Sequence, residues 1–391
     1  MESVGVLEAA LEAAFAQYDV EGERRLRVRF DMAHSRHVTV RDGRRYDADI
    51  LGSLILAQAS SRLARLVTDS PAALVEASGE KVRSLAAWSR EDELAWRMSV
   101  WDAVRENDAD ARWLRERGVY GGMQGIWVDA ERTRALRDLG VAVAVRHTGR
   151  HYADDIDDRM AIYYYPRTAR PASRDMNEVE AVKNAAELHL PIFFIGEGPR
   201  GLRPVRLAWV IAADDRAEVF LLEFAEAEPR HLDVDESRHP FELTVNRRRS
   251  RSTTERLVRA PEFKYRVLAR HGGRCAVTGL GIPVVLDAAH VVPVADGGSD
   301  DERNGLLLTA NLHRAFDAHL WAIEPSTLLL HVRRQGPSLS ELQVDALSLR
   351  SDVRPPHRDA LEWRWRKFAH STRSTDLGDT LADARVSGRI Q

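Results

Sequence analysis

The sequence has a single cysteine, Cys275, among 391 residues. One thiol cannot form an internal disulfide, and it cannot supply the paired cysteines of a structural zinc ribbon. The chain also lacks any apolar run near the ~20 residues that a membrane-spanning helix needs. Its opening stretch, MESVGVLEAALEAAF, carries acids and lacks a basic segment, so it does not resemble a secretory signal. We therefore expect a cytoplasmic protein that makes no membrane contact, with Cys275 in a core.

The chain carries little net charge. With 57 Lys and Arg against 60 Asp and Glu, the formal net charge is −3 at pH 7. This excludes a protein that binds nucleic acid through an overall positive charge. The exception is the stretch 246–275, which contains ten basic residues and only two acidic ones. This local basic segment predicts either contacts with phosphates or a solvated linker.

Length predicts two or three domains, at ~100–200 residues each. Residues 1–115 are typical of a mostly helical domain, with strands predicted at RRLRVRF and at HVTVRDGRRY around an Asp-Gly turn. Residues 116–230, the reading domain, carry the strand-like runs VAVAVRH, MAIYYYP, PIFFIG, VRLAWVIA and EVFLLEF and the helical run NEVEAVKNAAELH. A basic linker (231–260), a last domain (261–370) and a polar tail (371–391) follow. The fold class is multidomain α+β.

The last domain places a histidine at the end of an apolar, strand-like run, in DAAHVVP. His290 closes this run, Asn304 stands in RNGLLL, and His313 and Asp317 stand in NLHRAFD. The last two are i and i+4, so they lie on one face of a helix. Each residue alone would be ordinary: a core histidine, a turn asparagine and a helix-surface pair. Together they supply what phosphodiester hydrolysis needs, a base to activate water and ligands for a divalent cation.

Five blocks in order, C-A-V-T-G, D-A-A-H-V-V-P, a Gly-Gly loop, R-N-G-L-L-L and L-H-R-A-F-D, resemble the HNH (ββα-metal) endonucleases. The McrA-like branch is the most similar, and the resemblance covers about residues 262–325. It implies a C-terminal ββα-metal domain in which His290 is the general base. It also implies that Asn304 orients His290 through a hydrogen bond and that His313 is a metal ligand.

The second metal ligand is open. Ala289 stands where these enzymes often have a ligand, directly before the base, so Asp287 and Asp317 are the remaining candidates. Mg²⁺ or Mn²⁺ suits a site of carboxylate and imidazole, and Co²⁺, Ni²⁺ and Zn²⁺ also tolerate imidazole.

An HNH domain cuts with little sequence preference, because phosphates carry no sequence information. We therefore expect the reading domain to decide when cutting occurs. Its most distinctive stretch is YYYPRTARP. Such a stretch could form a small apolar dimple, suited to a soft, weakly solvated group on DNA and unable to satisfy a charged oxygen. The dimple would be lined by Tyr165, Pro166 and Ala169 and edged by Arg167 and Arg170.

Three blocks of the reading domain resemble the sulfur-binding domain of McrA-like restriction enzymes: V-Y-G-G-x-x-G-I-W at residues 119–127, Y-Y-P-R-T-x-R-P, and the K-N-A helix. That domain recognises phosphorothioate DNA, in which sulfur replaces one phosphate oxygen. The resemblance implies that Tyr165, Pro166 and Ala169 form the sulfur cavity. Arg117 and Lys183 are our candidates for neighbouring phosphate or base contacts. YYYP could instead be a strand of packed aromatic residues.

Together the two resemblances imply a type IV-like, modification-dependent restriction endonuclease that recognises phosphorothioate-modified double-stranded DNA and hydrolyses nearby phosphodiesters. The alternative mark is methylated or hydroxymethylated cytosine, flipped into a pocket that Tyr163, Tyr164 or Trp127 could line. A non-specific HNH nuclease and a DNA-binding regulator with an inactive nuclease fold are further alternatives. One HNH site nicks one strand, so cutting of both strands suggests a homodimer, with the N-terminal helices as its interface.

Overall fold

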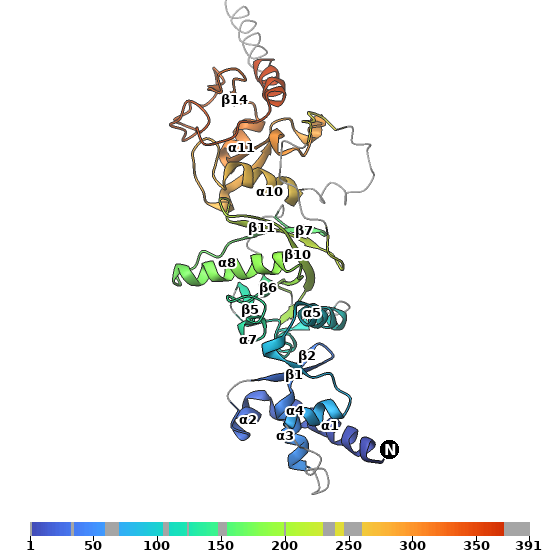
Figure 1. Ribbon diagram of the computed structural model, residues 1–391. Helices are drawn as coiled ribbons and strands as arrows, with labels where there is room; N and C mark the ends of the chain where they lie inside the picture. The colour runs from blue at the N-terminus through green and yellow to red at the C-terminus, as the bar shows by residue number, and fades with distance from the viewer. Residues whose placement is uncertain are drawn as a thin grey trace, which may run out of the picture. The chain divides into compact units, whose positions relative to one another are not determined.

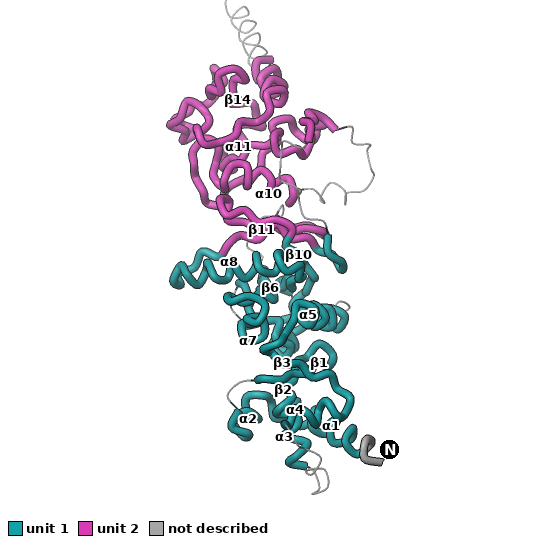
Figure 2. The backbone as a smooth tube through the Cα atoms, viewed as in Figure 1, with its two compact units in different colours: residues 1–150, 166–210, 224–229 teal, residues 151–165, 211–223, 230–391 magenta. Residues whose placement is uncertain are grey.

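The computed structural model describes the chain at residues 2–32, 35–58, 70–104, 109–122, 125–147, 155–198, 201–229, 239–245 and 260–370. Most of the predicted linker, six of the ten basic residues of the stretch 246–275, and the whole tail lie outside these residues. The chain divides into two compact units (Figure 2): residues 1–150, 166–210 and 224–229, and residues 151–165, 211–223 and 230–391. Among the helices described, none combines the length and apolar composition of a membrane span.

The first unit begins with helices that share an apolar core. Helices α1 (Glu2–Glu21), α3 (Ala48–Gln58) and α4 (Pro71–Ala77) carry it (Figure 1). Helix α4 begins where the Ser70 side chain accepts a hydrogen bond from the Ala73 N–H, and proline stands at its first position. The helical character predicted for this part of the chain is confirmed in these elements.

The segment RRLRVRF is a helix, so the strand predicted there is wrong. Helix α2 (Glu23–Arg29) is supported by an ion pair 2.6 Å long between Arg27 and Glu23, one turn apart. The alternation of apolar residues suggested a half-buried strand. Val28 is nevertheless 80% exposed, and only Leu26 is buried in this helix.

The hairpin predicted around the Asp-Gly turn is confirmed. Strands β1 (His37–Arg41) and β2 (Arg44–Asp47) pair antiparallel, and β3 (Arg83–Ser84) adds to the other side of β1. Asp42 and Gly43 have φ of 49° and 70°, as a two-residue turn that matches the strand twist requires.

All five strand-like runs of the reading domain form strands of one sheet, in the order β5-β6-β8-β10-β11-β7. Strands β6 and β8 pair parallel and are buried at nearly every position, so both their faces are covered. The division between the two units falls within β10. The predicted helix is α8 (Ala172–Glu187), which packs on β5 and β6. The strands are β5 (Ile126–Val128), β6 (Ala142–Arg146), β7 (Met160–Tyr164), β8 (Ile192–Ile195), β10 (Val205–Asp214) and β11 (Val219–Phe224).

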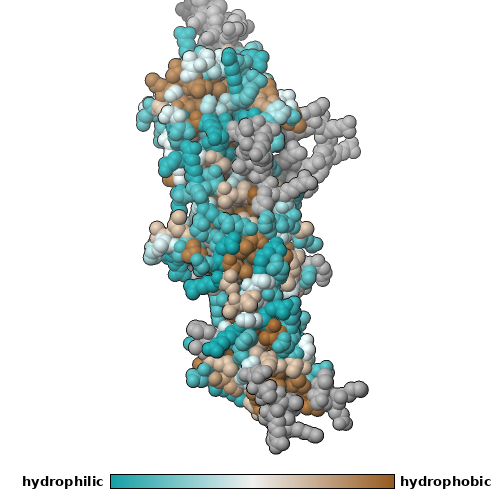
Figure 3. All heavy atoms as spheres, viewed as in Figure 1, coloured by the Kyte–Doolittle hydropathy of each residue, from teal (hydrophilic) through white to brown (hydrophobic). Residues whose placement is uncertain are grey.

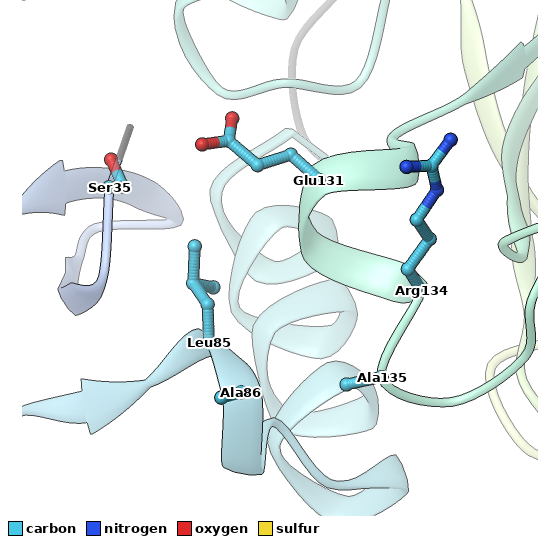
Figure 4. A pocket seen from close by; sticks show the side chains of 6 residues that line it. All are labelled: Ser35, Leu85, Ala86, Glu131, Arg134 and Ala135. Atoms are coloured by element: carbon cyan, nitrogen blue, oxygen red, sulfur yellow. The ribbon is translucent and has the colours of Figure 1, made fainter. Parts of the chain in front are cut away.

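Shorter elements complete the first unit. Strand β4 (Ala109–Asp110) pairs with β9 (Leu202–Arg203), and helices α6 (Ala111–Glu116) and α7 (Ala130–Thr133) flank β5 in sequence. An open pocket of about 360 Å³ lies between α7 and the β3 region. Figure 4 shows Glu131 extending toward Ser35 across this pocket and Arg134 extending away from it. The pocket contains none of the predicted site residues.

A buried ion network ties helix α5 (Arg90–Val104) to the sheet. The Glu93 carboxylate accepts hydrogen bonds from Trp88 Nε1 (2.9 Å), Arg97 Nε (2.9 Å) and Arg132 Nε (2.8 Å). Arg97 also donates to the Pro191 carbonyl, just before β8. Burial opposes the charge, but Arg132 and Arg97 outweigh it and lower the pKa of Glu93 to about 2. Because α5 shares a hydrophobic core with β6 and β8, the boundary predicted at residue 115 falls inside one core.

Replacement of Glu93 with Gln should lower the free energy of unfolding by about 3–5 kcal/mol, because it removes the carboxylate that pairs with the buried Arg97 and leaves the buried Arg132 with Asp129 alone. Urea denaturation followed by tryptophan fluorescence measures this. The wild type should lose the same stabilisation as the pH falls from about 4.5 toward 2, since the folded-state pKa is the lower one. Glu116→Gln, which breaks an exposed pair with Arg112, should cost less than about 1 kcal/mol. Equal losses for the two variants would contradict the account.

The second unit contains the predicted hairpin and helix. Helix α10 (Ala260–His271) precedes the antiparallel strands β12 (Leu286–His290) and β13 (Gly305–Thr309), and α11 (Ala310–Asp317) follows. Strands β14 (Trp321–Ile323) and β15 (Leu330–Val332) pair next, and residues 358–370 are helical. Cys275 is buried, as expected. The order strand, strand, helix is therefore confirmed for this part of the chain.

Surface composition agrees with a chain of balanced charge. On the face shown in Figure 3, hydrophilic residues separate smaller apolar areas. Large exposed apolar side chains include Val20, Val28 and Leu347, at 84%, 80% and 69% exposure, from well-separated positions in the sequence. Single apolar residues of this kind are normal on soluble proteins.

Candidate active site

The hairpin and α11 bring the predicted catalytic residues into one region. His290 ends β12 and pairs across the hairpin with Gly305, the first residue of β13. Helix α11 begins directly after β13 and carries His313 and Asp317. Asp287 lies near the start of β12, so one short strand carries both a candidate ligand and the candidate base.

His290 is held on two sides. Its Nε2 lies 3.1 Å from Asp300 Oδ1, and its ring stacks on Phe263 of α10 with centroids 3.8 Å apart and planes 11° apart. An ionised carboxylate can only accept a hydrogen bond, so Nε2 is the donor in this contact and Nδ1 is the nitrogen available to act as a base. The side chain is 20% exposed. The ring can therefore accept a proton from a water molecule while its orientation stays fixed.

Asn304 does not bond to His290, which corrects the role that the resemblance implied. Its side-chain oxygen accepts from the Val292 N–H (2.9 Å), and its amide donates to the carbonyls of Val292 (3.1 Å) and Ser299 (2.9 Å). Because the side chain is fully buried, its polar atoms must find partners inside the protein, and the loop backbone supplies them. These bonds close the loop that ends at Asp300. Asn304 thus holds the backbone of the loop next to Asp300, the residue that contacts His290.

Gly305 makes room for the ring stack. A Cβ atom at this position would lie 2.3 Å from Val267 Cγ2 and 3.1 Å from Phe263 Cζ, both on α10. The missing side chain therefore lets α10 lie directly against the hairpin beside His290.

His313 stands between two carboxylates. Its Nδ1 is 3.1 Å from Asp287 Oδ2 and its Nε2 is 3.3 Å from Asp317 Oδ2. Burial favours the neutral ring, but hydrogen bonds to Asp287 and Asp317 outweigh it and raise the pKa of His313 to about 9. A metal ion that takes His313 as a ligand has to displace this proton, because only the neutral ring coordinates.

The donor set fits a cation bound by a pair of side chains. Across the described residues, no three His, Cys, Asp or Glu side chains are placed to hold a metal ion. Asp317 also interacts with the buried Arg364, whose Nη2 is 3.4 Å from Oδ1. Asp287 has His313 as its ion-pair partner in the described part of the chain. Asp287 therefore has fewer competing partners than Asp317 in the described residues, and both stay candidates for the second ligand beside His313.

Tyr165 of the reading domain belongs to the second unit and is held from two directions. Its hydroxyl donates to Asp215 Oδ1 (2.9 Å), and its ring lies 4.5 Å from that of Phe220. Burial and the Asp215 carboxylate raise the pKa of the phenol above its usual range. The Tyr165 ring therefore has a fixed position.

The residues that follow Tyr165 belong to the first unit. Thr168 donates its N–H and its hydroxyl to Asp175, both at 2.9 Å. Arg170 is bound by Asp175 and Glu178, each at 2.7 Å, and its place at the edge of a dimple stays a prediction. Pro166 is partly exposed, and Arg167 and Ala169 are exposed.

The two predicted flanking cations have local partners. Arg117 ends α6, donates from Nε to the Asp42 carbonyl (3.2 Å) and stacks over Trp113 at 3.8 Å. Lys183 pairs with Glu180 on α8 at 2.8 Å. The contacts described here do not bring Arg117 and Lys183 together.

Sequence reasoning missed two residues that contact His290. Asp300 stands in the loop GGSDD, where an acidic pair after two glycines was the available signal. Phe263 lies in a helix far from His290 in sequence, and nothing in the helix pattern distinguishes it from an ordinary core residue.

The hairpin and α11 thus carry a histidine held by a carboxylate, His290 with Asp300, and a second pair of imidazole and carboxylate, His313 with Asp287. Residues 275–324 match the family model described as HNH endonuclease, so this part of the chain is an HNH endonuclease domain. Enzymes of this family use divalent metal ions. No curated protein matches the chain.

The solved structures that are similar to the chain include two restriction endonucleases. One is titled a modification dependent TagI restriction endonuclease, with 19% identity, 63% of this chain and 94% of that chain covered, and a TM-score of 0.22. The other is titled the type IV phosphorothioation-dependent restriction endonuclease ScoMcrA, with 12% identity, 93% and 99% covered, and a TM-score of 0.22.

Asp300→Asn should reduce kcat by about 10- to 100-fold, because an amide can donate to Nε2 and reverse the tautomer of His290. Single-turnover cleavage with Mn²⁺, on a DNA that the wild type cuts, measures this. Asp296→Asn is the control, since it makes the same change in the same loop at a half-exposed side chain. Equal rates for the two variants would show that Asp300 does not orient the base.

Asp287→Asn should raise the Mn²⁺ concentration for half-maximal cleavage by about 10-fold or more, whereas Asp317→Asn should raise it less than about threefold. The reason is that Arg364 already interacts with Asp317. A metal titration of the cleavage rate compares the two variants. The reverse order would make Asp317 the second ligand.

Proposed function

We propose that the chain is a type IV-like restriction endonuclease that recognises phosphorothioate DNA through its reading domain and hydrolyses nearby phosphodiesters in its HNH domain. The nuclease part is supported by the family match and by the arrangement of His290, Asp300, Asp287 and His313. In this mechanism His290 Nδ1 takes a proton from the attacking water. Asp287 and His313 would hold a divalent cation, which would supply stabilisation of the charge on the phosphate and the leaving oxygen.

The sulfur-reading part is supported by the segment that runs from Tyr165 to Ala169. A phosphorothioate sulfur is larger and more weakly solvated than the oxygen it replaces, so it favours an apolar contact over a charged one. Tyr165 is fixed by Asp215, and Ala169 is exposed in a segment that Thr168 fastens to Asp175. A DNA backbone can therefore reach the Ala169 methyl group. Arg167 is the exposed cation of this segment.

Modified cytosine is the second candidate mark, and the structure uses two of its proposed pocket residues elsewhere. Trp127 donates from Nε1 to the Gly118 carbonyl (2.9 Å), and a Cβ on Gly121 would lie 2.0 Å from its ring. Tyr163 is buried, at 7% exposure. Because these rings already pack inside the protein, phosphorothioate remains the first choice of mark.

The partner is double-stranded DNA, and a homodimer remains our prediction for cutting both strands. The apolar side of α1 packs inside the first unit, through Leu7, Leu11 and Phe15. A dimer formed by this helix would therefore use its exposed residues, among them Val20.

Cleavage of one duplex in four forms tests the proposal: unmodified, cytosine-methylated, and carrying one phosphorothioate as either separated diastereomer. The sulfur takes the place of one particular oxygen in each diastereomer, so a shaped contact should accept only one of them. We expect wild type to cut one phosphorothioate form at least about 10-fold faster than the unmodified duplex. Ala169→Asp should abolish this preference, because it places a negative charge where the sulfur would lie. Ala135→Asp, at another exposed alanine of the reading domain, should keep it.

The other outcomes separate the alternatives. Faster cutting of the methylated duplex would keep the nuclease and replace the mark. Equal cutting of all four forms would make the chain a non-specific HNH nuclease. Binding of marked DNA without cutting in Mg²⁺, Mn²⁺, Co²⁺ or Ni²⁺ would make it a DNA-binding regulator.

A further inference from the structure

Helix α10 is packed on two sides within the second unit. It contacts strands β12 and β13 of the nuclease hairpin, and it also contacts β7 of the six-stranded sheet (Figure 1). Phe263 and Val267 lie toward the hairpin, where both approach Gly305. The next residue after Phe263 is Lys264. Neighbouring residues of a helix point about 100° apart, so Lys264 can face a different element from Phe263.

Lys264 forms a buried ion pair with Asp155. The Nζ–Oδ1 distance is 2.6 Å, and each side chain is 2% exposed. Asp155 belongs to the β7 side, because its carbonyl accepts from the Ile162 N–H of that strand at 2.7 Å. A buried pair stabilises a fold little more than apolar residues of the same size would. It does impose one geometry, since each buried charge needs the other in place.

A second contact joins α10 to the same sheet. Gly272, at the end of α10, has φ of 60°, and a Cβ on it would lie 2.3 Å from Arg216 Nε. A Cβ on Gly273 would lie 3.1 Å from Ala217 Cα. Both partners lie in the turn between β10 and β11. The hydroxyl of Tyr165 is bonded to Asp215 in that turn.

We propose that Lys264 is a positioning residue for the nuclease reaction: its ion pair with Asp155 fixes α10, and hence Phe263, the ring on which His290 stacks. A displacement of β7 or of the β10–β11 turn would then move α10 as a rigid helix, and with it Phe263 and the His290 ring that stacks on it. The second part of the proposal rests on the proposed function. It states that binding of marked DNA near Tyr165 changes the position of α10 and so aligns the base.

Three variants separate positioning from stability. Lys264→Met should lower kcat by about 10- to 100-fold with KM for DNA changed less than about threefold, because the side chain is too buried to touch DNA. The double variant Lys264→Met with Asp155→Leu replaces the pair by apolar residues and should recover the Tm while kcat stays low. Lys367→Met is the control, since it breaks an exposed pair 4.0 Å long in the same unit and should keep the wild-type kcat.

A double variant with both the wild-type Tm and the wild-type kcat would overturn the proposal, since the pair would then only stabilise the fold. A Lys264→Met protein that fails to fold leaves the test intact, because the double variant removes both buried charges of the pair. The pH dependence of kcat/KM should also change shape in the double variant, since it reports the protonation of His290. An unchanged profile together with a low kcat would likewise contradict a role that acts through His290.

The coupling is tested by the ratio of cleavage rates on marked and unmarked DNA. In the double variant, affinity for marked duplex should stay at the wild-type value while the rate ratio falls toward one. A wild-type ratio retained in the double variant would overturn the coupling. If wild type itself showed no preference for marked DNA, the proposed function would fail, whereas the kcat comparison on unmarked DNA would still decide the role of Lys264.

Discussion

The nuclease site depends on one close approach, that of helix α10 to the β12–β13 hairpin. The ring of Phe263 lies 3.8 Å from that of His290, and this spacing exists only because Gly305 has no side chain between the helix and the strand. A catalytic base must keep its orientation while it remains open to water. Here the Phe263 ring covers one face of the His290 ring, and Asp300 holds Nε2 of His290. The other face of the His290 ring and its Nδ1 therefore remain available to the reaction.

Chemistry and positioning are divided between partly exposed and buried residues. The side chains of His290, His313 and Asp287 are 20%, 26% and 29% exposed, enough for water, a cation or a phosphate to reach them. Asn304 and Lys264 are almost fully buried and cannot touch DNA. Burying these polar groups costs desolvation free energy. The hydrogen bonds of Asn304 hold the loop in place, and the ion pair of Lys264 holds helix α10 in place.

Much of the fold was predictable because buried strands and helices have recognisable patterns of apolar residues in the sequence. The runs VAVAVRH and PIFFIG are apolar throughout, as strands covered on both faces must be, and the spacing of His290, Asn304 and His313 marked the hairpin and helix. The pattern failed at RRLRVRF, where local ion pairing outweighed alternation. It also could not show which residue holds His290. Phe263 and Lys264 act through contacts between segments distant in sequence, and Asp300 reaches His290 across a loop whose shape only folding sets.

The central claim is that the chain itself distinguishes sulfur from oxygen on a DNA backbone. The most direct measurement uses the His290→Ala protein, which should retain the reading domain but not the base. Fluorescence anisotropy at fixed salt would give its Kd for one duplex in the unmodified form and as each phosphorothioate diastereomer. We predict that one diastereomer binds at least about 10-fold more tightly than the unmodified duplex, a difference of about 1.4 kcal/mol. Equal dissociation constants for all three duplexes would contradict the account.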